Sequence, residues 1–265
     1  MIMYSIYDNK FIGYNNHFED EEFTGSDNQE LFNENLRTMP EDWYYRTAKV
    51  TYKRNAWGHR CKPITDINVD NYILTTGCSL TEGVGLEIQN TYTHVLAEKL
   101  NCDYYNLGLG GSGVDAMFHN LVMWLADMPH KPKLVVIQWP YWVRFLHFNK
   151  NPTSCDMSEN EIYPGSVHTN SKVFANFINS GEDINYFETV ETLNKIKLEH
   201  LLKYTYNIPC IHTGIPYGNR KPLNFVNDYV ELIRRDYARD NHHGILSHKE
   251  LAENLYEIAI TKHNL

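Results

Sequence analysis

The chain has 265 residues and a formal net charge of −9, with 42% hydrophobic and 22% charged residues. This length and composition are typical of a soluble globular protein with a sizeable core, and no apolar run approaches the length of a membrane-spanning helix. The acidic balance argues against nucleic acid as a partner, because binding it needs a basic surface.

The cysteines and histidines give no sign of a disulfide framework or a metal site. Five cysteines are scattered without a Cys-x-x-Cys pair, and 13 histidines lack the ligand spacing of zinc sites. The first residues also lack the charged and then apolar layout of a signal peptide. We therefore expect a soluble, cytoplasmic protein that needs no metal or cofactor and binds neither nucleic acid nor membrane.

Residues 1–70 are polar, aromatic and acidic, without a clear hydrophobic period. Their apolar residues are too few to form a core of their own. We predict that they form an N-terminal extension that wraps a main domain spanning residues 71–265.

Strands and helices are predicted to alternate from residue 72 onward. Runs of consecutive apolar residues predict buried strands, and apolar residues at helical spacing predict helices. The predicted strands are residues 72–76, 103–107, 133–139 and 208–213, and the predicted helices are residues 91–100, 114–128, 185–206, 225–237 and 247–262. This alternation predicts a parallel sheet with helices on both faces, a three-layer α/β/α sandwich.

Two local patterns add detail to this prediction. The segment at about 145–183 lacks periodicity and contains Pro152 and Pro164, so we expect an insertion that forms one wall of a pocket. Ser247 is followed three residues later by Glu250, which predicts a capping box at the start of the last helix.

A serine lies where the chemistry of such a sheet is expected. Ser79 follows the first buried strand and stands between Gly77 and Gly83, and ligands bind beyond the carboxyl ends of parallel strands. A serine hydroxyl becomes a good nucleophile only when a base removes its proton and a carboxylate orients that base. Asp240 and His243 supply both groups, so we predict Ser79 as nucleophile, His243 as base and Asp240 as orienting carboxylate.

His242 and His243 are adjacent, which leaves two candidates for the base. The Asp-x-x-His spacing from Asp240 favours His243, and His242 is then an ordinary loop residue.

Three blocks of sequence resemble the SGNH (GDSL-type) hydrolase superfamily. They are Gly77-Cys78-Ser79-Leu80-Thr81-Glu82-Gly83, Asn106-Leu107-Gly108-Leu109-Gly110-Gly111-Ser112-Gly113 and Asp240-Asn241-His242-His243, and Asn55-Ala56-Trp57-Gly58-His59-Arg60 is similar to an element that often precedes the domain. The resemblance covers about residues 50–260 and implies a flavodoxin-like α/β/α fold with ester hydrolysis or O-acyl transfer. It also implies an oxyanion hole formed by the backbone N–H groups of Ser79 and Gly111.

The chain departs from the family after the third strand. An asparagine that donates to the oxyanion is usual there, whereas this chain has Gln138 followed by Trp139 and no asparagine. Gln138 and Tyr141 are the candidate replacements, and the alternative is a donor from another loop. Trp139 and Trp142 are candidates for stacking on a substrate or for packing the pocket wall.

Arg144, just past the third strand, is a candidate contact for an anionic substrate, with a surface ion pair as the alternative. The glycine block also spells Gly108-x-Gly110-x-x-Gly113, the pattern of a dinucleotide site. Such a site needs an acidic residue at the end of the next strand, and none is present, so we do not expect a nicotinamide or flavin cofactor.

The sequence thus predicts a serine-dependent hydrolase of carboxylic esters, with O-acetyl groups on carbohydrate as one candidate substrate. Because the asparagine is missing, a second hypothesis is a weak or inactive module of the same fold that binds carbohydrate or belongs to a virion. O-acyl transfer is a third.

Overall fold

The computed structural model describes residues 4–6, 11–14, 20–140, 144–148, 162–166, 184–215 and 228–265. Its centre is a five-stranded sheet in which every neighbouring pair of strands is parallel. The strands are β3 (Tyr72–Thr76), β4 (Asp103–Asn106), β5 (Leu134–Trp139), β8 (Cys210–Gly214) and β9 (Tyr229–Glu231).

The strands of this sheet lie in the order β4-β3-β5-β8-β9. When they are counted along the chain, this is the order 2-1-3-4-5 of flavodoxin-like, doubly wound sheets. The prediction of an α/β fold with a parallel, flavodoxin-like sheet is therefore confirmed.

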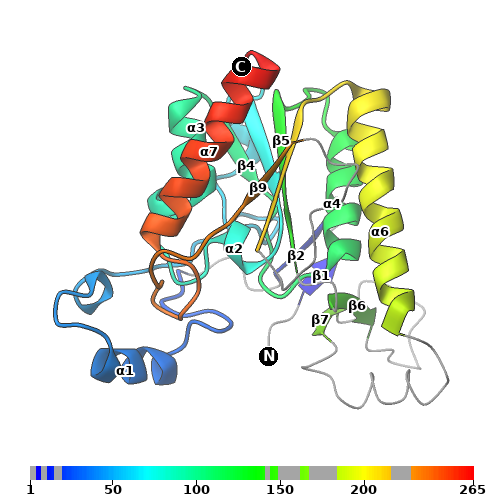
Figure 1. Ribbon diagram of the computed structural model, residues 1–265. Helices are drawn as coiled ribbons and strands as arrows, with labels where there is room; N and C mark the ends of the chain where they lie inside the picture. The colour runs from blue at the N-terminus through cyan, green and yellow to red at the C-terminus, as the bar shows by residue number, and fades with distance from the viewer. Residues whose placement is uncertain are drawn as a thin grey trace.

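Helices cover both faces of the sheet (Figure 1). One face carries α4 (Val114–Asp127) and α6 (Ile184–His200), which pack on each other, and the other carries α3 (Tyr92–Lys99) and α7 (Ile245–His263), which also pack together. None of the helices in the described ranges combines the length and the apolar character needed to cross a lipid bilayer.

The core has two halves because side chains alternate across a strand. Leu74 of β3 packs in one half with Leu121 and Leu198, on the side of α4 and α6. Its neighbour Ile73 packs in the other half with Leu96 and Leu251, on the side of α3 and α7.

A second, antiparallel sheet joins two segments that are distant in sequence. Its order is β2-β1-β7-β6, so strands from the predicted N-terminal extension and from the predicted insertion share one sheet. These strands are β1 (Tyr4–Ile6), β2 (Ile12–Tyr14), β6 (Arg144–Phe148) and β7 (Ile162–Ser166).

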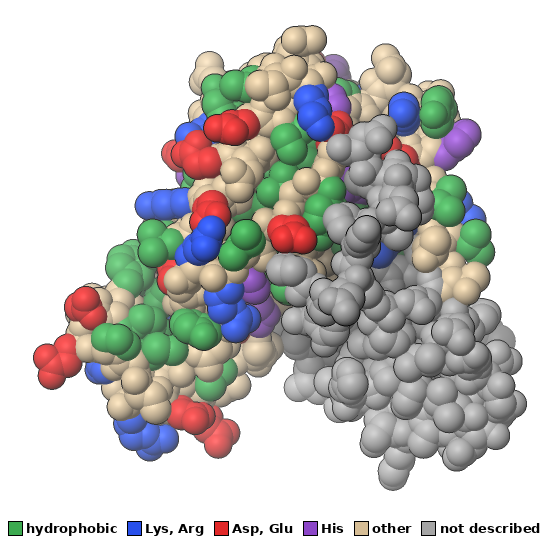
Figure 2. All heavy atoms as spheres, in the orientation of Figure 1, with side chains coloured by type: hydrophobic (Ala, Val, Ile, Leu, Met, Phe, Trp, Pro, Cys, Tyr) green, Lys and Arg blue, Asp and Glu red, His purple; other side chains and the backbone are tan. Residues whose placement is uncertain are grey.

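The remainder of the extension packs near the start of α7. It contains helix α1 (Gln29–Thr38), and its buried residues Tyr45 and Tyr52 form a small cluster with Leu86 and Ala238 of the main domain. Figure 1 shows α1 below the N-terminal end of α7. On the face shown in Figure 2, the acidic and basic side chains of the described residues are interspersed, without a continuous basic patch.

Two predicted helix features are wrong. Residues 228–237 form β9 and an extended loop instead of a helix, because Val230 and Leu232 complete the buried edge of the sheet. Ser247 also does not cap the last helix, which begins at Ile245. Asp236 takes that role from the preceding loop, since its carboxylate accepts from the N–H groups of Leu246 and Ser247 at 3.0 Å.

Candidate active site

Ser79 is the first residue of the short helix α2 (Ser79–Glu82), which begins three residues after β3. The intervening Gly77 lies too close to its neighbours for any side chain, because a Cβ there would stand 2.1 Å from the Thr81 hydroxyl. We call residues 77–79 the serine turn. It presents the Ser79 hydroxyl at the carboxyl edge of the sheet, as the sequence predicted.

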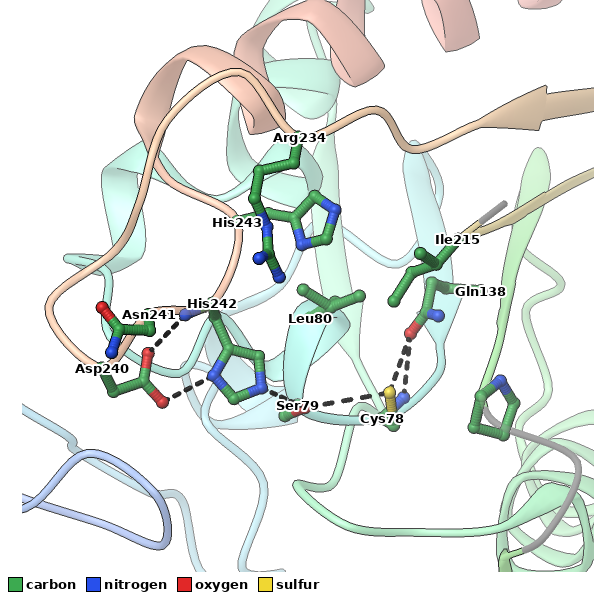
Figure 3. A pocket seen from close by; sticks show the side chains of 11 residues that line it. Cys78, Ser79, Leu80, Gln138, Ile215, Arg234, Asp240, Asn241, His242 and His243 are labelled. Atoms are coloured by element: carbon green, nitrogen blue, oxygen red, sulfur yellow. Dashed lines mark hydrogen bonds and ion pairs between the residues drawn. The ribbon is translucent and has the colours of Figure 1, made fainter. Parts of the chain in front are cut away.

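Ser79, His242 and Asp240 form a continuous hydrogen-bonded chain (Figure 3). The Ser79 Oγ lies 2.8 Å from His242 Nε2, and His242 Nδ1 lies 2.6 Å from Asp240 Oδ2. A carboxylate can only accept, so Nδ1 carries the proton and Nε2 accepts from the serine hydroxyl. This is the tautomer in which an imidazole can remove a serine proton.

Asp240 is fully buried and strongly held. Its Oδ2 also accepts a hydrogen bond of 2.6 Å from the Ser26 hydroxyl, and its Oδ1 accepts one from the backbone N–H of His242. Burial alone raises the pKa of the Asp240 carboxyl, but the hydrogen bonds from His242 and Ser26 outweigh it and lower that pKa below the ordinary value. Asp240 is therefore ionised and can hold His242 in one orientation.

The prediction that His243 lies beside Ser79 is wrong, because His242 occupies that place. Asn241 has a left-handed backbone with φ of 67°, so the chain reverses between Asp240 and His242, and the two side chains meet. His243 instead pairs through its backbone with Tyr237. Burial and the nearby charge of an arginine lower the pKa of its ring to about 4.

Residues 236–243, which we call the histidine loop, are held by the N-terminal extension. Arg239 is buried, and its guanidinium binds the Asp27 carboxylate at 2.6 to 3.0 Å. The Asn35 side chain donates to the Arg239 carbonyl, and the Tyr52 hydroxyl binds Asp27 at 2.5 Å. Asp27, Asn35 and Tyr52 from outside the loop, together with its own Arg239, thus fix its course next to Asp240.

Gly85 allows the histidine loop to approach the main domain. A Cβ at this position would stand 2.3 Å from Asp240 Oδ1, and its φ of 79° disfavours other residues. Its carbonyl accepts from the Arg239 N–H, and its N–H donates to the Tyr52 hydroxyl.

A buried charge ties α2 to the glycine turn after β4. Glu82 is fully buried, and its Oε2 accepts from the Gly110 N–H at 2.7 Å and from the Tyr14 hydroxyl at 2.7 Å. Its other oxygen lies 3.4 Å from the Arg54 guanidinium. The turn that contains Gly111 is thereby fixed beside the serine turn, although Gly111 itself does not line the pocket.

Gln138 lines the pocket, but its amide is engaged with the protein. Its Oε1 accepts from the Cys78 N–H at 3.2 Å, and its amide nitrogen donates to the Trp139 carbonyl at 2.7 Å. A backbone N–H requires an acceptor and a carbonyl requires a donor, so the orientation of the amide is fixed. Gln138 therefore braces the serine turn in this structure.

The pocket at Ser79 has a volume of about 200 Å³. Its lining combines the serine turn, the end of β5, Ile215 and the histidine loop (Figure 3). The lining residues are Cys78, Ser79, Leu80, Gln138, Pro140, Ile215, Arg234, Asp240, Asn241, His242 and His243.

None of the predicted substrate contacts is placed in the pocket by the described part of the structure. Trp139 does not line the pocket but packs in the opposite half of the core, where its ring stacks on His212. Tyr141 and Trp142 lie outside the described residues, and for Arg144 only the backbone of β6 is described. Arg234 also lines the pocket, from the loop after β9, and was not predicted from the sequence.

Glu199, Cys210 and His212 are close enough to one another to suggest a metal site. The hydrogen bonds argue against it. The Trp139 indole donates to His212 Nδ1 at 3.1 Å, so His212 Nε2 carries the proton and donates to Glu199 at 2.7 Å. A metal on Nε2 would require both ring nitrogens to be deprotonated. The group is better explained as a link between α6 and the sheet.

No family model and no curated protein matches the sequence. Solved structures similar to this one include an acetyl xylan esterase from the rumen bacterium Butyrivibrio proteoclasticus, with 16% identity over 73% of this chain and 64% of that one and a TM-score of 0.47. A family two carbohydrate esterase from Clostridium thermocellum, in complex with cellohexaose, has 16% identity, coverage of 74% and 65%, and a TM-score of 0.44.

A third similar structure is a putative lipolytic protein of the G-D-S-L family from Desulfitobacterium hafniense, with 13% identity, coverage of 71% and 99%, and a TM-score of 0.41. It belongs to the family that the sequence blocks resemble. The chain spans less than two thirds of the length of the two esterases, at 64% and 65%. With such low identities, the activity of this chain has to be argued from its own site.

Proposed function

We propose that the chain is a serine-dependent hydrolase of small carboxylic esters, of the SGNH type. The observation that carries the proposal is the hydrogen-bonded order Ser79–His242–Asp240 at the floor of a pocket. Each member has the polarity its role needs: a hydroxyl that donates, a ring nitrogen that accepts, and an ionised carboxylate.

In the proposed mechanism, the Ser79 Oγ attacks the ester carbonyl while His242 Nε2 takes the hydroxyl proton. His242 then gives this proton to the departing alkoxide, which leaves as the alcohol, and the acyl group stays on Ser79. A water molecule, deprotonated by His242, attacks the acyl-serine and releases the acid. Asp240 holds the ring and stabilises its charged form.

The oxyanion would be stabilised by backbone N–H groups. Ser79 is the first residue of α2, and the first N–H groups of a helix have no partner within it. Gly111, which the family resemblance implies as the second donor, lies in the turn bound to Glu82. A pocket of about 200 Å³ suits a short acyl group such as acetyl, because larger ligands usually occupy pockets of about 300 Å³ or more.

The test is hydrolysis of 4-nitrophenyl acetate, with labelling of the protein by a fluorophosphonate that reacts with activated serines. The Ser79→Ala variant should lose both reactions. Equal hydrolysis by the variant would contradict the mechanism.

One observation favours a second candidate, a slow enzyme or a binding module. The Gln138 amide is fully buried and its position is fixed by hydrogen bonds to the Cys78 N–H and the Trp139 carbonyl, so only its second N–H is left for an oxyanion. Loss of one such donor typically costs about 10²–10³ in rate. A chain that binds acetylated carbohydrate but is not labelled at Ser79 would support the binding module. Transfer of the acyl group to an added sugar hydroxyl would instead support an O-acyltransferase.

A further inference from the structure

The pocket carries one charge that the proposed mechanism does not use. Among the described residues that line it, Arg234 is the only lysine or arginine. Figure 3 shows its side chain reaching from the loop after β9 toward His243 and His242. Arg234 is exposed, whereas Ser79 at the floor is buried, so the guanidinium stands at the mouth of the pocket.

No described residue neutralises this guanidinium. The described residues give Arg234 no carboxylate partner, and its guanidinium lies over the ring of Tyr237, 5.2 Å from the ring centroid. The neighbouring Arg235 differs, since both its Nε and its Nη2 bind Glu250, at 2.5 and 2.7 Å. The carboxylate of the nearby Asp236 accepts hydrogen bonds from the first N–H groups of α7.

The charge of Arg234 also affects a histidine that lines the pocket. The pKa of His243 is lowered to about 4, first by burial and next by the positive charge of Arg234. A cation held beside a partly desolvated pocket attracts an anion more strongly than one on an open surface. In a chain of net charge −9, such a local cation favours the approach of an anionic ligand to this site over the rest of the surface.

We infer that Arg234 selects esters whose alcohol portion carries a carboxylate, such as the acetyl ester of a sugar acid. The inference rests on the proposed function and names its substrate class. The short acyl group would occupy the buried floor at Ser79, and the larger alcohol would remain at the mouth. There the guanidinium can bind a carboxylate through two parallel hydrogen bonds.

The experiment compares 4-acetoxybenzoate with its neutral methyl ester. The measured quantity is the ratio of kcat/KM for the anionic ester to kcat/KM for the neutral ester. Because the two leaving groups differ slightly, the change of this ratio on substitution is compared between variants. Arg234→Gln should lower the ratio about tenfold, the effect of losing one charge-assisted interaction. Arg234→Lys should retain part of the preference, and added salt should weaken it.

Arg235→Gln is the matched control, because it removes the same charge one residue away, outside the pocket. It should leave the ratio within about twofold. An unchanged ratio in Arg234→Gln would overturn the inference, as would an equal loss for both esters, which would show that Arg234 acts on the catalytic groups instead.

Binding separates this inference from the proposed function. In a Ser79→Ala background, calorimetry can measure the affinity for 4-acetoxybenzoate and for its methyl ester without turnover. A preference for the anion that disappears in Ser79→Ala/Arg234→Gln supports the inference even if the native chain hydrolyses neither ester. Equal affinities in both backgrounds refute it even if the native chain is an active esterase.

Discussion

The two sides of the site are built by different means. Ser79 is placed by the sheet itself, since it follows β3 directly and its turn is braced by Gln138 from the neighbouring strand. Asp240 and His242 lie in the histidine loop, which is held by side chains of the N-terminal extension. The nucleophile is therefore positioned mainly by the sheet, with Tyr14 and Arg54 of the extension bound to Glu82 of the same helix, whereas the base is positioned mainly by the extension.

The difference extends to the kind of interaction. The serine side relies on parallel strand pairing, on the hydrogen bond from the Cys78 N–H to Gln138, and on buried Glu82, whose carboxylate lies 3.4 Å from the Arg54 guanidinium. The histidine side relies on a buried ion pair between Arg239 and Asp27, which is costly to disrupt. We expect the histidine side to be the more sensitive to substitution and to acid, and the four predictions that follow test this from the largest effect to the smallest.

The first prediction separates the two adjacent histidines. His242→Gln should lower kcat/KM for 4-nitrophenyl acetate by about 10²–10⁴, the contribution of a general base. His243→Gln should cost much less, because His243 does not contact Ser79. Steady-state kinetics of both variants measures this, and a larger loss in His243→Gln would refute the assignment of the base.

The second prediction concerns the support of the loop. Asp27→Ala leaves the buried Arg239 guanidinium without its partner, so the free energy of unfolding should fall by about 3–5 kcal/mol. Denaturant unfolding measures this fall. Glu250→Ala breaks the solvent-exposed pair with Arg235 and should lower the free energy of unfolding much less, because water screens that pair. Similar losses in the two variants would contradict the special role of the buried pair.

The sequence sufficed for the serine side because local patterns determine it. A run of apolar residues followed by glycines places Ser79 at the end of a buried strand, and the structure confirms that position. The choice between His242 and His243 depends on the backbone of Asn241, whose left-handed conformation turns His242 back to Asp240. Asn tolerates this conformation better than most residues, so the Asp-Asn pair was the sequence feature that could have indicated a turn and favoured His242.

The position of Trp139 could have been inferred from the alternation of side chains along β5. Val135, Ile137 and Trp139 share one face, and the first two pack against α4 and α6. Gln138, between Ile137 and Trp139, points to the other face of the sheet, and its side chain binds the serine turn. The bond from Ser26 to Asp240 spans 214 residues, so no local pattern could predict it.

The third prediction is that acid destabilises the fold through three buried histidines, of which His243 belongs to the histidine loop. Burial is the main cause that lowers the pKa of His59 and His243 to about 4 and of His248 to about 3. Between about pH 6.5 and pH 4 the unfolded chain binds protons that the folded chain does not, so stability falls as the pH falls.

Each of these histidines should contribute up to about 1.4 kcal/mol per pH unit in that range. Denaturant unfolding at several pH values measures the slope. His248→Gln should make it shallower, although it removes the acceptor for the Tyr92 N–H and lowers stability at every pH. A slope that stays the same in His248→Gln would contradict the assignment to buried neutral histidines.

The last prediction tests whether the extension acts on the chemistry as well as on stability. Ser26→Ala removes a hydrogen bond of 2.6 Å to Asp240, which should raise the pKa of that carboxyl and lower kcat about threefold to tenfold, with KM unchanged. Ser26→Thr keeps the hydroxyl and should retain activity. The matched control is Asn28→Ala, which removes the side-chain cap of α1 and a hydrogen bond to the Ser26 carbonyl, at about 1 kcal/mol of stability, and leaves the Ser26 hydroxyl in place. If both alanine variants lower kcat equally, the extension only supports the loop. If Ser26→Ala alone does so, the extension supplies a positioning residue for Asp240, and the histidine side of the site is incomplete without it.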